Sequence, residues 1–198
     1  GIAQPKDIPD FARKIHVEAS RMIQLVNDIL QLSNLDNVSE AGTPLTMETV
    51  DLLEVARECV ERQKVNAKRS FISLTYLGES APVLGSRSLL DELCQNLCDN
   101  AIRYNRPGGK VQIITACTRD GHCSLTVKDN GIGIPKEAQS SVFERFYRVD
   151  KSRSKATGGT GLGLAIVKHI ARIHNARIKL ESEIGEGTTI TVLFETAH

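Results

Sequence analysis

The segment Asn96–Asn105, with the sequence NLCDNAIRYN, contains side chains that could bind a metal-loaded nucleotide. Asn96 and Asn100 are four residues apart, so they share one face of a predicted helix. An amide on a leucine-rich helix is costly to bury without a partner. Its oxygen is also a neutral ligand that Mg²⁺ accepts together with water and phosphate oxygens. A pair of solvated or helix-capping amides is the alternative interpretation.

A second segment, DNGIGIP at Asp129–Pro135, directly follows a predicted strand. Asp129 could accept a hydrogen bond from an exocyclic amine such as that of adenine, a donor that guanine lacks at the same position. Gly131 and Gly133 would let the backbone approach a flat ligand where a Cβ would clash. A simple Asp-Asn-Gly turn is the alternative.

A third segment, GGTGLGLAIVKHI at Gly158–Ile170, has four glycines that run into an amphipathic helix. Backbone N–H groups and a helix N-terminus are therefore available for phosphates. The segment is not a P-loop, because no Gly-Lys-Ser/Thr follows the glycines. It is not a dinucleotide fingerprint either, because polar residues and no buried strand precede it. Each segment alone is weak evidence, but the three together favour a nucleotide site.

The composition excludes several classes of protein. Lys and Arg number 25 against 24 Asp and Glu, and aromatic residues make up 4%, which argues against a nucleic-acid partner. No apolar run approaches the roughly 20 residues that cross a bilayer, so no direct membrane contact is expected from this segment. The five cysteines include no C-x-x-C pair, which indicates reduced thiols in a cytoplasmic compartment and no disulfide framework or zinc site.

The elements that must position these segments begin with a long amphipathic helix over residues 7–36, whose apolar stripe must either fold back on its own domain or meet partner helices. A polar break at Asn37–Gly42 divides the chain into domains 1–42 and 43–198. Beyond it the pattern predicts an α+β, two-layer sandwich, with one mixed sheet and helices on one face. The predicted helices are 50–67, 88–104, 136–148 and 161–174, and the predicted strands are 43–47, 71–77, 111–118, 123–129, 177–183 and 188–195.

The three segments, together with FERFYR at Phe143–Arg148, resemble the N, G1, F and G2 boxes of bacterial sensor histidine kinases, in that order. GEGTT at Gly185–Thr189 is similar to the family's final Gly-x-Gly-Thr element. Ile15–Asp36 resembles the second helix of the family's dimerisation and phosphotransfer domain. The resemblance implies an ATP-binding fold of the Bergerat or GHKL type, preceded by a long bundle helix, with ATP and Mg²⁺ as ligands.

The resemblance also implies a role for each motif. Asn100 would hold Mg²⁺, Asp129 would read the adenine amino group, and Thr188 would help to seat adenine. Ile134–Thr160 would form a lid with a glycine hinge that faces the phosphates, and Arg148 would be its phosphate contact. The residues assigned to nucleotide binding are Asn100, Arg103, Tyr104, Asp129, Gly131, Gly133, Ile134, Arg148, Gly159, Thr160, Gly161, Leu162, Gly163 and Thr188, with Asn96, Asn100 and Arg103 assigned to catalysis and Asn100 to the metal.

The function implied is transfer of the ATP γ-phosphoryl group to a histidine, followed by relay to a response-regulator aspartate. The implied setting is a homodimer held by its own dimerisation helices, in a cytoplasmic segment of a membrane-anchored sensor. The family's acceptor histidine precedes an acidic residue and a Thr-Pro pair, and no such segment occurs here, since His16 is followed by Val-Glu-Ala-Ser. We therefore expect this chain not to autophosphorylate, and we expect the acceptor segment before Gly1 of a longer protein.

Three other functions compete with this interpretation. ATP-hydrolysing machines such as DNA gyrase place a glutamate base four residues before the magnesium asparagine. Here that position is Asn96, and Glu92 lies a further turn away, so hydrolysis should be slow. A serine-directed kinase of the anti-sigma-factor type would not need the preceding bundle helix. A docking module with a dead nucleotide site would not need Asn100 and Asp129 intact.

Overall fold

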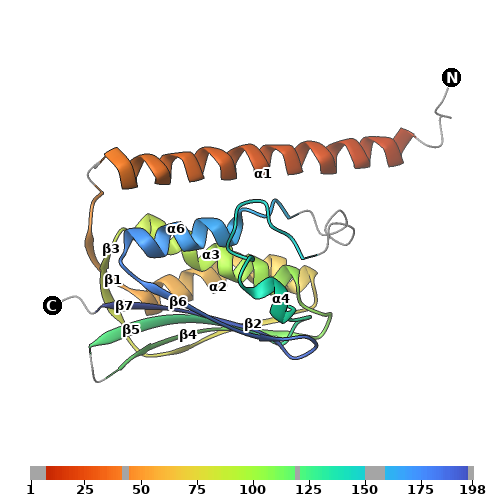
Figure 1. Cartoon of the computed structure of the whole chain (residues 1–198). Coiled ribbons are helices and arrows are strands. Elements are labelled where there is room, and N and C mark those ends of the chain that lie inside the picture. Colours follow the sequence, from red (N-terminus) through yellow and green to blue (C-terminus); the bar gives the residue numbers. More distant parts are fainter. Residues whose placement is uncertain (1–7, 42–44, 119–120, 150–158, 196–198) are drawn as a thin grey trace.

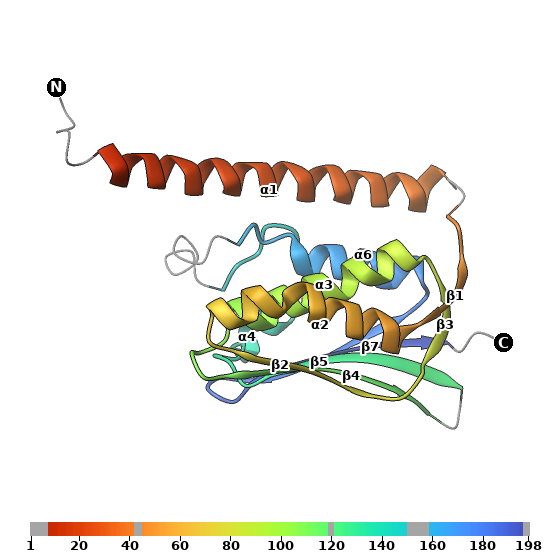
Figure 2. The ribbon, with the colours of Figure 1, turned by 180° about the vertical axis from the view of Figure 1, so that it is seen from behind.

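The computed structural model of this chain describes residues 8–41, 45–118, 121–149 and 159–195. A sheet forms one layer, helices cover one of its faces, and a long helix lies on the far side of that helix layer (Figure 1). The view from behind shows the same order of layers (Figure 2). The helices are α1 (Ile8–Ala41), α2 (Leu52–Arg69), α3 (Arg87–Arg103), α4 (Lys136–Gln139) and α6 (Gly163–Ile173); the strands are β1 (Glu48–Asp51), β2 (Ser73–Gly78), β3 (Pro82–Gly85), β4 (Lys110–Cys117), β5 (His122–Asp129), β6 (Arg177–Glu183) and β7 (Gly187–Glu195).

The main sheet has five strands in the order β2-β4-β5-β7-β6. β2 is parallel to β4, and the other neighbours are antiparallel, so the sheet is mixed as predicted. Alternate residues such as Leu125 and Val127 are buried against the helices, since successive strand residues point to opposite faces. Asp129 continues that same face at the end of β5, which directs it toward the helix layer.

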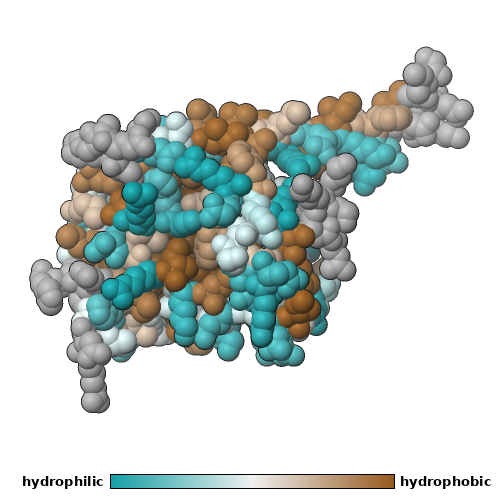
Figure 3. All heavy atoms as spheres, viewed as in Figure 1, coloured by the Kyte–Doolittle hydropathy of each residue, from teal (hydrophilic) through white to brown (hydrophobic). Residues whose placement is uncertain are grey.

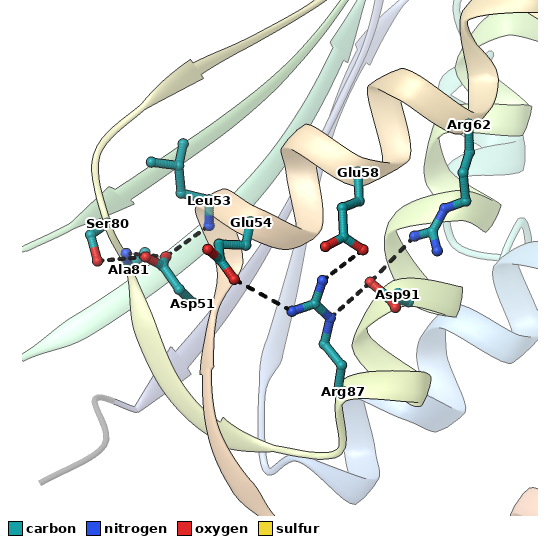
Figure 4. Close-up of polar contacts among 9 residues, drawn as sticks. All are labelled: Asp51, Leu53, Glu54, Glu58, Arg62, Ser80, Ala81, Arg87 and Asp91. Atoms are coloured by element: carbon teal, nitrogen blue, oxygen red, sulfur yellow. Dashed lines mark hydrogen bonds and ion pairs between the residues drawn. The ribbon is translucent and has the colours of Figure 1, made fainter.

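Helix α3 is held in place by an apolar face and by an ion-pair network with α2. Leu90, Leu93 and Leu97 recur at helical spacing and are at most 2% exposed. Arg87, at the start of α3, contacts Glu58 on α2 at 2.8 Å and Asp91 one turn further on at 3.2 Å (Figure 4). This network orients the helix that carries both motif asparagines.

Asp51, the residue before α2, lies near this network, at the same end of the helix layer (Figure 4). The Asp51 carboxylate accepts hydrogen bonds from the backbone N–H of Leu53 and of Ala81, and from the Ser80 hydroxyl (Figure 4). The first of these caps the helix N-terminus, and the other two join it to the segment that leads into β3. These hydrogen bonds lower the pKa of Asp51 against the opposing effect of burial.

Helix α1 is docked at one end and exposed at the other. Leu32 and Leu35 are buried where α1 packs on α6. Phe11 and Met22 are 47% and 68% exposed, and hydrophobic side chains lie along the outer side of α1 (Figure 3). The C-terminal part of the apolar stripe therefore folds back on this chain, which was one expectation. The rest of the stripe faces away from the domain, as expected if partner helices cover it.

Some predicted boundaries were wrong. α1 continues to Ala41, through most of the predicted break at Asn37–Gly42. The predicted helix 136–148 is helical only at Lys136–Gln139. The residues after it form turns, in which the Glu144 N–H donates to the Ser141 carbonyl, and Phe146 has a φ of 62° and donates its N–H to the carbonyl of Gly161. A strand expected at 43–47 lies instead at Glu48–Asp51, where it pairs with β3. The sequence pattern did not predict β3.

The expectation of five reduced cysteines was also wrong for one pair. Antiparallel pairing of β4 and β5 places Cys117 opposite Cys123, with their Cα atoms 4.1 Å apart, and a disulfide joins them. The spacing of the two cysteines in the sequence does not indicate a disulfide, because the register of the β4–β5 hairpin is what brings them together. Cys59, Cys94 and Cys98 are free, as predicted, and they are buried, where a thiol packs as a small apolar side chain.

Candidate nucleotide-binding site

A cavity of about 640 Å³ lies between α3, α6, the ends of β5 and β7, the segment after β5, and α1. It brings together most of the predicted site residues from four separate motifs. Those that line it are Asn96, Asn100, Arg103, Tyr104, Asp129, Gly133, Ile134, Arg148, Gly159, Thr160, Gly161, Gly163 and Thr188. Gly131 and Leu162 are not among the lining residues, and Leu162 is fully buried in the core. The predicted lid residues Lys151, Arg153 and Lys155 lie outside the described part of the chain.

One end of the cavity, the base end, is built around Asp129. Its Oδ1 accepts hydrogen bonds from the backbone N–H of Gly131 at 2.8 Å and of Thr188 at 3.3 Å. Burial raises the pKa of this carboxyl, and the two hydrogen bonds oppose that shift. Because both bonds go to the same oxygen, Oδ2 is the oxygen left to accept from a ligand. The walls beside it are apolar and suit a flat ring: Val127, Ile132, Ile134, Ile184 and Ile190.

Gly131 and Gly133, at the base end, lie where the backbone leaves no room for a side chain. A Cβ on Gly131 would overlap the carbonyl oxygen of Tyr104, and a Cβ on Gly133 would overlap that of Glu183. Gly133 also has a φ of 72°, which side chains rarely adopt. Both glycines therefore allow close approach between two parts of the protein's own backbone beside Asp129.

The other end, the asparagine end, is formed where α6 meets α3. The Asn96 amide donates to the Glu92 carbonyl, and a Cβ on Gly163 would lie 2.9 Å from Asn96 Oδ1, so α6 packs closely on α3 at this point. Asn100 lies one turn further along α3, and its side-chain amide makes no hydrogen bond within the described residues. Its oxygen fits a hard cation such as Mg²⁺, which accepts neutral amide oxygens beside phosphate and water.

Helix α1 contributes to this end in a way that the motifs did not predict. Gln24 and Asp28 line the cavity, and Asp28 is only 7% exposed. Asp28 Oδ2 accepts a hydrogen bond of 2.6 Å from the Thr160 hydroxyl. A signal was available: Asp28 interrupts a stripe of spacing three and four, in which Leu25, Leu32 and Leu35 otherwise pack inward.

Two further carboxyls lie close to the asparagine end. Burial raises the pKa of Glu92 to about 7, with a smaller raising effect from Asp28 and a lowering effect from a hydrogen bond with Gln31. Glu92 Oε1 is buried without a hydrogen-bond partner among the described residues, and Glu92 does not line the cavity. Burial also raises the pKa of Asp99, although Arg103 and a hydrogen bond from Gln63 oppose the shift. Anionic ligands therefore meet acidic neighbours here as well as Arg103.

Helix α1 also contacts Arg145, within the segment predicted to form a lid, and His169 on α6. Arg145 Nη2 lies 2.8 and 2.9 Å from the two carboxylate oxygens of Asp36, and His169 Nδ1 lies 3.6 Å from one of them. α1 thus reaches residues on both sides of the segment 150–158.

Among the described helices, none is both long enough and apolar enough to cross a bilayer.

Comparison with known proteins identifies the family. The model of the "Histidine kinase-, DNA gyrase B-, and HSP90-like ATPase" family matches residues 85–198. The sensor-like histidine kinase SenX3 of Mycolicibacterium smegmatis is 43% identical over 192 residues, which cover 95% of this chain and 48% of that protein. The sensor histidine kinase YkoH of Bacillus subtilis is 37% identical, with 98% and 41% covered. This chain therefore spans about half the length of the curated relatives it matches.

Solved structures agree with this result. The mycobacterial sensor histidine kinase MprB is 32% identical, with a TM-score of 0.65 over 76% of this chain and 97% of that chain. Full-length ShkA in complex with AMPPNP has a TM-score of 0.78 at 23% identity, over 96% of this chain and 39% of that one, and supports the fold alone. The gyrase-type and serine-kinase alternatives are not favoured. The chain belongs to the histidine kinase-, DNA gyrase B- and HSP90-like ATPases, and it carries the ATP-binding catalytic domain of a sensor histidine kinase.

Proposed function

We propose that this chain binds ATP with Mg²⁺ in the cavity and donates the γ-phosphoryl group to a histidine of the protein's dimerisation and phosphotransfer domain. The observation that carries the proposal is the arrangement of one cavity with two chemically different ends. A half-buried carboxylate, Asp129, lies among apolar walls at the base end, and the amide of Asn100 lies at the asparagine end. Such a cavity matches a ligand that has a flat amine-bearing base and a metal-bound polyanion.

The residues would act mainly by positioning. Asp129 Oδ2 would accept from the adenine amino group, and Thr188 beside it would help to seat the base. Asn100 would hold Mg²⁺, which when bound supplies neutralisation of the charge on the phosphates. Arg103 would approach the phosphates, and Asn96 would support Asn100 from the preceding turn. Phosphoryl transfer requires little covalent chemistry from the protein itself, so alignment of the reactants and neutralisation of charge account for most of the catalysis.

The remaining site assignments are proposed on their place in the cavity. Ile134 lies beside the base end, whereas the Tyr104 hydroxyl faces Gly159, where an added Cβ would lie 3.3 Å away, and Arg148 lies on the predicted lid segment. Gly159, Thr160, Gly161 and Gly163 precede or begin α6, where backbone N–H groups and the helix N-terminus favour phosphates.

We further propose that residues 1–42 are part of a dimerisation and phosphotransfer domain, and that the complete protein is a homodimer. The exposed apolar part of α1 supports this, because such a stripe needs other helices to cover it. The phosphate would pass from the acceptor histidine to an aspartate of a response-regulator receiver domain. His16 lies on an exposed part of α1 and lacks the expected neighbours, so the acceptor is assigned to another segment.

Calorimetric titration of this chain with ATP and Mg²⁺ tests the nucleotide site. The expected result is saturable heat for the unaltered chain, lost in Asp129→Asn and in Asn100→Asp. Asp10→Asn and Asn27→Asp are matched controls, because both residues are exposed on α1, away from the cavity lining. Full binding by a folded Asp129→Asn variant would overturn the proposal.

The transfer step needs a separate measurement. Radiolabelled ATP should leave no acid-labile phosphate on this chain alone, and it should label a supplied protein that carries the acceptor helix. Brisk steady-state release of phosphate from ATP, without an acceptor, would instead favour an ATP-hydrolysing machine.

A further inference from the structure

Three polar side chains form one row across the base end of the sheet. Antiparallel pairing places Asp129 of β5 opposite Thr188 of β7, and Thr188 opposite Ser182 of β6. Residues that are directly opposite in neighbouring strands point to the same face. The next row inward on that face is apolar, with Val127 opposite Ile190 and Ile190 opposite Leu180. Asp129 and Thr188 line the cavity, and Ser182 lies behind them.

The hydrogen bonds of Ser182 account for every proton and lone pair of its hydroxyl group. A serine hydroxyl has one proton to donate and two lone pairs to accept with. Ser182 Oγ donates to the Gly187 carbonyl at 2.8 Å and accepts from the Ile134 N–H at 2.8 Å. Its remaining neighbour is Thr188 Oγ1, at 2.9 Å. Because the Ser182 proton is already used, this last contact is a hydrogen bond only when Thr188 donates.

The consequence for Thr188 is a fixed polarity. Its only hydroxyl proton points to Ser182, away from the cavity, and only lone pairs are left for a ligand. Asp129 beside it is also an acceptor, since a carboxylate offers lone pairs alone. The base end of the cavity thus presents acceptors at two adjacent positions.

We infer that Ser182 is a positioning residue that makes Thr188 an acceptor, so that the base end selects a purine with a 6-amino group over one with a 6-oxo group. The inference rests on the proposed nucleotide function of the cavity and adds the origin of its base selectivity. The exocyclic 6-amino group brings two N–H donors, one for each of the adjacent acceptors Asp129 and Thr188. A 6-oxo group brings lone pairs against both acceptors, and its ring N1–H, at the next ring position, can pair with at most one of them. A site built to pair with one group rejects the analogue that leaves its polar atoms unpaired.

Gln139 provides a matched control, because it holds the same two residues without touching the hydroxyl groups. Its Nε2 donates to the backbone carbonyls of Ile134 and Ser182, both at 2.9 Å. A change at Gln139 therefore loosens the backbone around Ser182 but leaves the protons of Ser182 and Thr188 where they are. A change at Ser182 releases the Thr188 proton as well.

The experiment measures the affinities of ATP and ITP, each with Mg²⁺, for the unaltered chain and for three variants. ITP carries a 6-oxo group where ATP carries the 6-amino group. The unaltered chain should prefer ATP. In Ser182→Ala the freed Thr188 hydroxyl can turn and donate to the 6-oxo group, so the preference should fall by about tenfold, the size of one hydrogen bond. Gln139→Ala should weaken both nucleotides alike and keep the ratio.

Thr188→Val makes the test independent of whether Ser182→Ala folds. It removes the hydroxyl, so the ratio should fall here too, and adding Ser182→Ala to it should change the ratio no further. Circular dichroism and thermal unfolding establish which variants are folded. An unchanged ratio in Thr188→Val or in folded Ser182→Ala, or an equal loss in Gln139→Ala, would overturn the inference. Absence of ATP binding to the folded, unaltered chain would instead refute the proposed function.

Discussion

The two ends of the cavity are built in different ways. The base end comes from neighbouring strands of one sheet, and its polar atoms are matched by cross-strand pairs and by the turns that join them. The asparagine end is assembled from α3, α6, the lid segment and α1, which are far apart in the chain. The base end is therefore determined by sheet register, whereas the asparagine end depends on how separate elements pack.

The ends also differ in what their carboxylates do. Asp129 turns one oxygen to backbone N–H groups and leaves the other for a ligand. Asp28 accepts hydrogen bonds from Thr160 and from Gln24, so both of its oxygens are used within the protein. In this structure the base end has a free carboxylate oxygen for a base, whereas a carboxylate with both oxygens hydrogen-bonded within the protein lines the asparagine end.

The largest expected effect comes from breaking the base end at Gly133. Gly133→Ala should lower the free energy of unfolding by about 3 kcal/mol, because it adds an overlap with the Glu183 carbonyl to the strain of a positive φ. Gly108→Ala is the matched control: its φ is also positive, at 82°, but no atom lies within 4 Å of the added Cβ, so only about 1 kcal/mol should be lost. Chemical denaturation measures both, and equal losses would contradict the backbone overlap.

At the asparagine end, one substitution should strengthen nucleotide binding. Asp28→Asn removes a negative charge beside the proposed phosphate position, so ATP affinity should rise by at least about tenfold, because two like charges about 4 Å apart repel by roughly 1 kcal/mol in bulk water and about 4 kcal/mol near a protein surface. Asp10→Asn, which removes an exposed charge from the same helix, should change nothing. Titration with ATP and Mg²⁺ measures the effect, and weaker binding in Asp28→Asn would show that this carboxylate assists the ligand.

Glu92, close to the asparagine end, should make the free energy of unfolding depend on pH. Glu92 has a pKa of about 7 in the folded protein against 4.5 in its ordinary state, so the folded protein keeps a proton that the unfolded chain releases between these values. The free energy of unfolding contributed by this group should therefore fall as the pH rises from about 4.5 to about 7. Burial lowers the pKa of His174, which has the opposite effect on stability in acid, so the comparison must be made between variants.

Glu92→Gln is the variant that isolates this group. Urea unfolding of both proteins between pH 4.5 and 8 should show a gap in stability that widens with pH in favour of the variant. A gap that stays constant would show that Glu92 does not titrate in this range.

The smallest effect is expected where α1 touches the lid segment. Asp36→Asn should weaken the contact with Arg145 by about 0.5 kcal/mol, because both side chains are partly exposed and the pair is screened by solvent. Faster amide hydrogen exchange in the last turns of α1, with no change in the sheet, would be the observable result. Asp10→Asn, which breaks an exposed pair with Arg13, is the control.

Much of the fold could be predicted from local pattern. The strand 177–183 was predicted with its observed bounds, and α2, α3 and α6 differ from prediction by a few residues, because their apolar periodicity is strong. The irregular stretch after Gln139 was not predicted, since Phe146 adopts its positive φ only through a contact with Gly161. β1 and β3 are short, and each depends on the other for pairing.

The amino-acid sequence by itself determined the order of the motifs, the kind of ligand that they suit and the elements that carry Asn100, Asp129 and Thr188. It could do so because turns, strand ends and helix faces depend on neighbouring residues. Only the tertiary structure decided that Cys117 bonds Cys123, that Ser182 lies within hydrogen-bond distance of Thr188, and that Asp28 lines the asparagine end. Asp28 and Thr160 are 132 residues apart, and a hydrogen bond over that distance exists only once α1 has packed on α6.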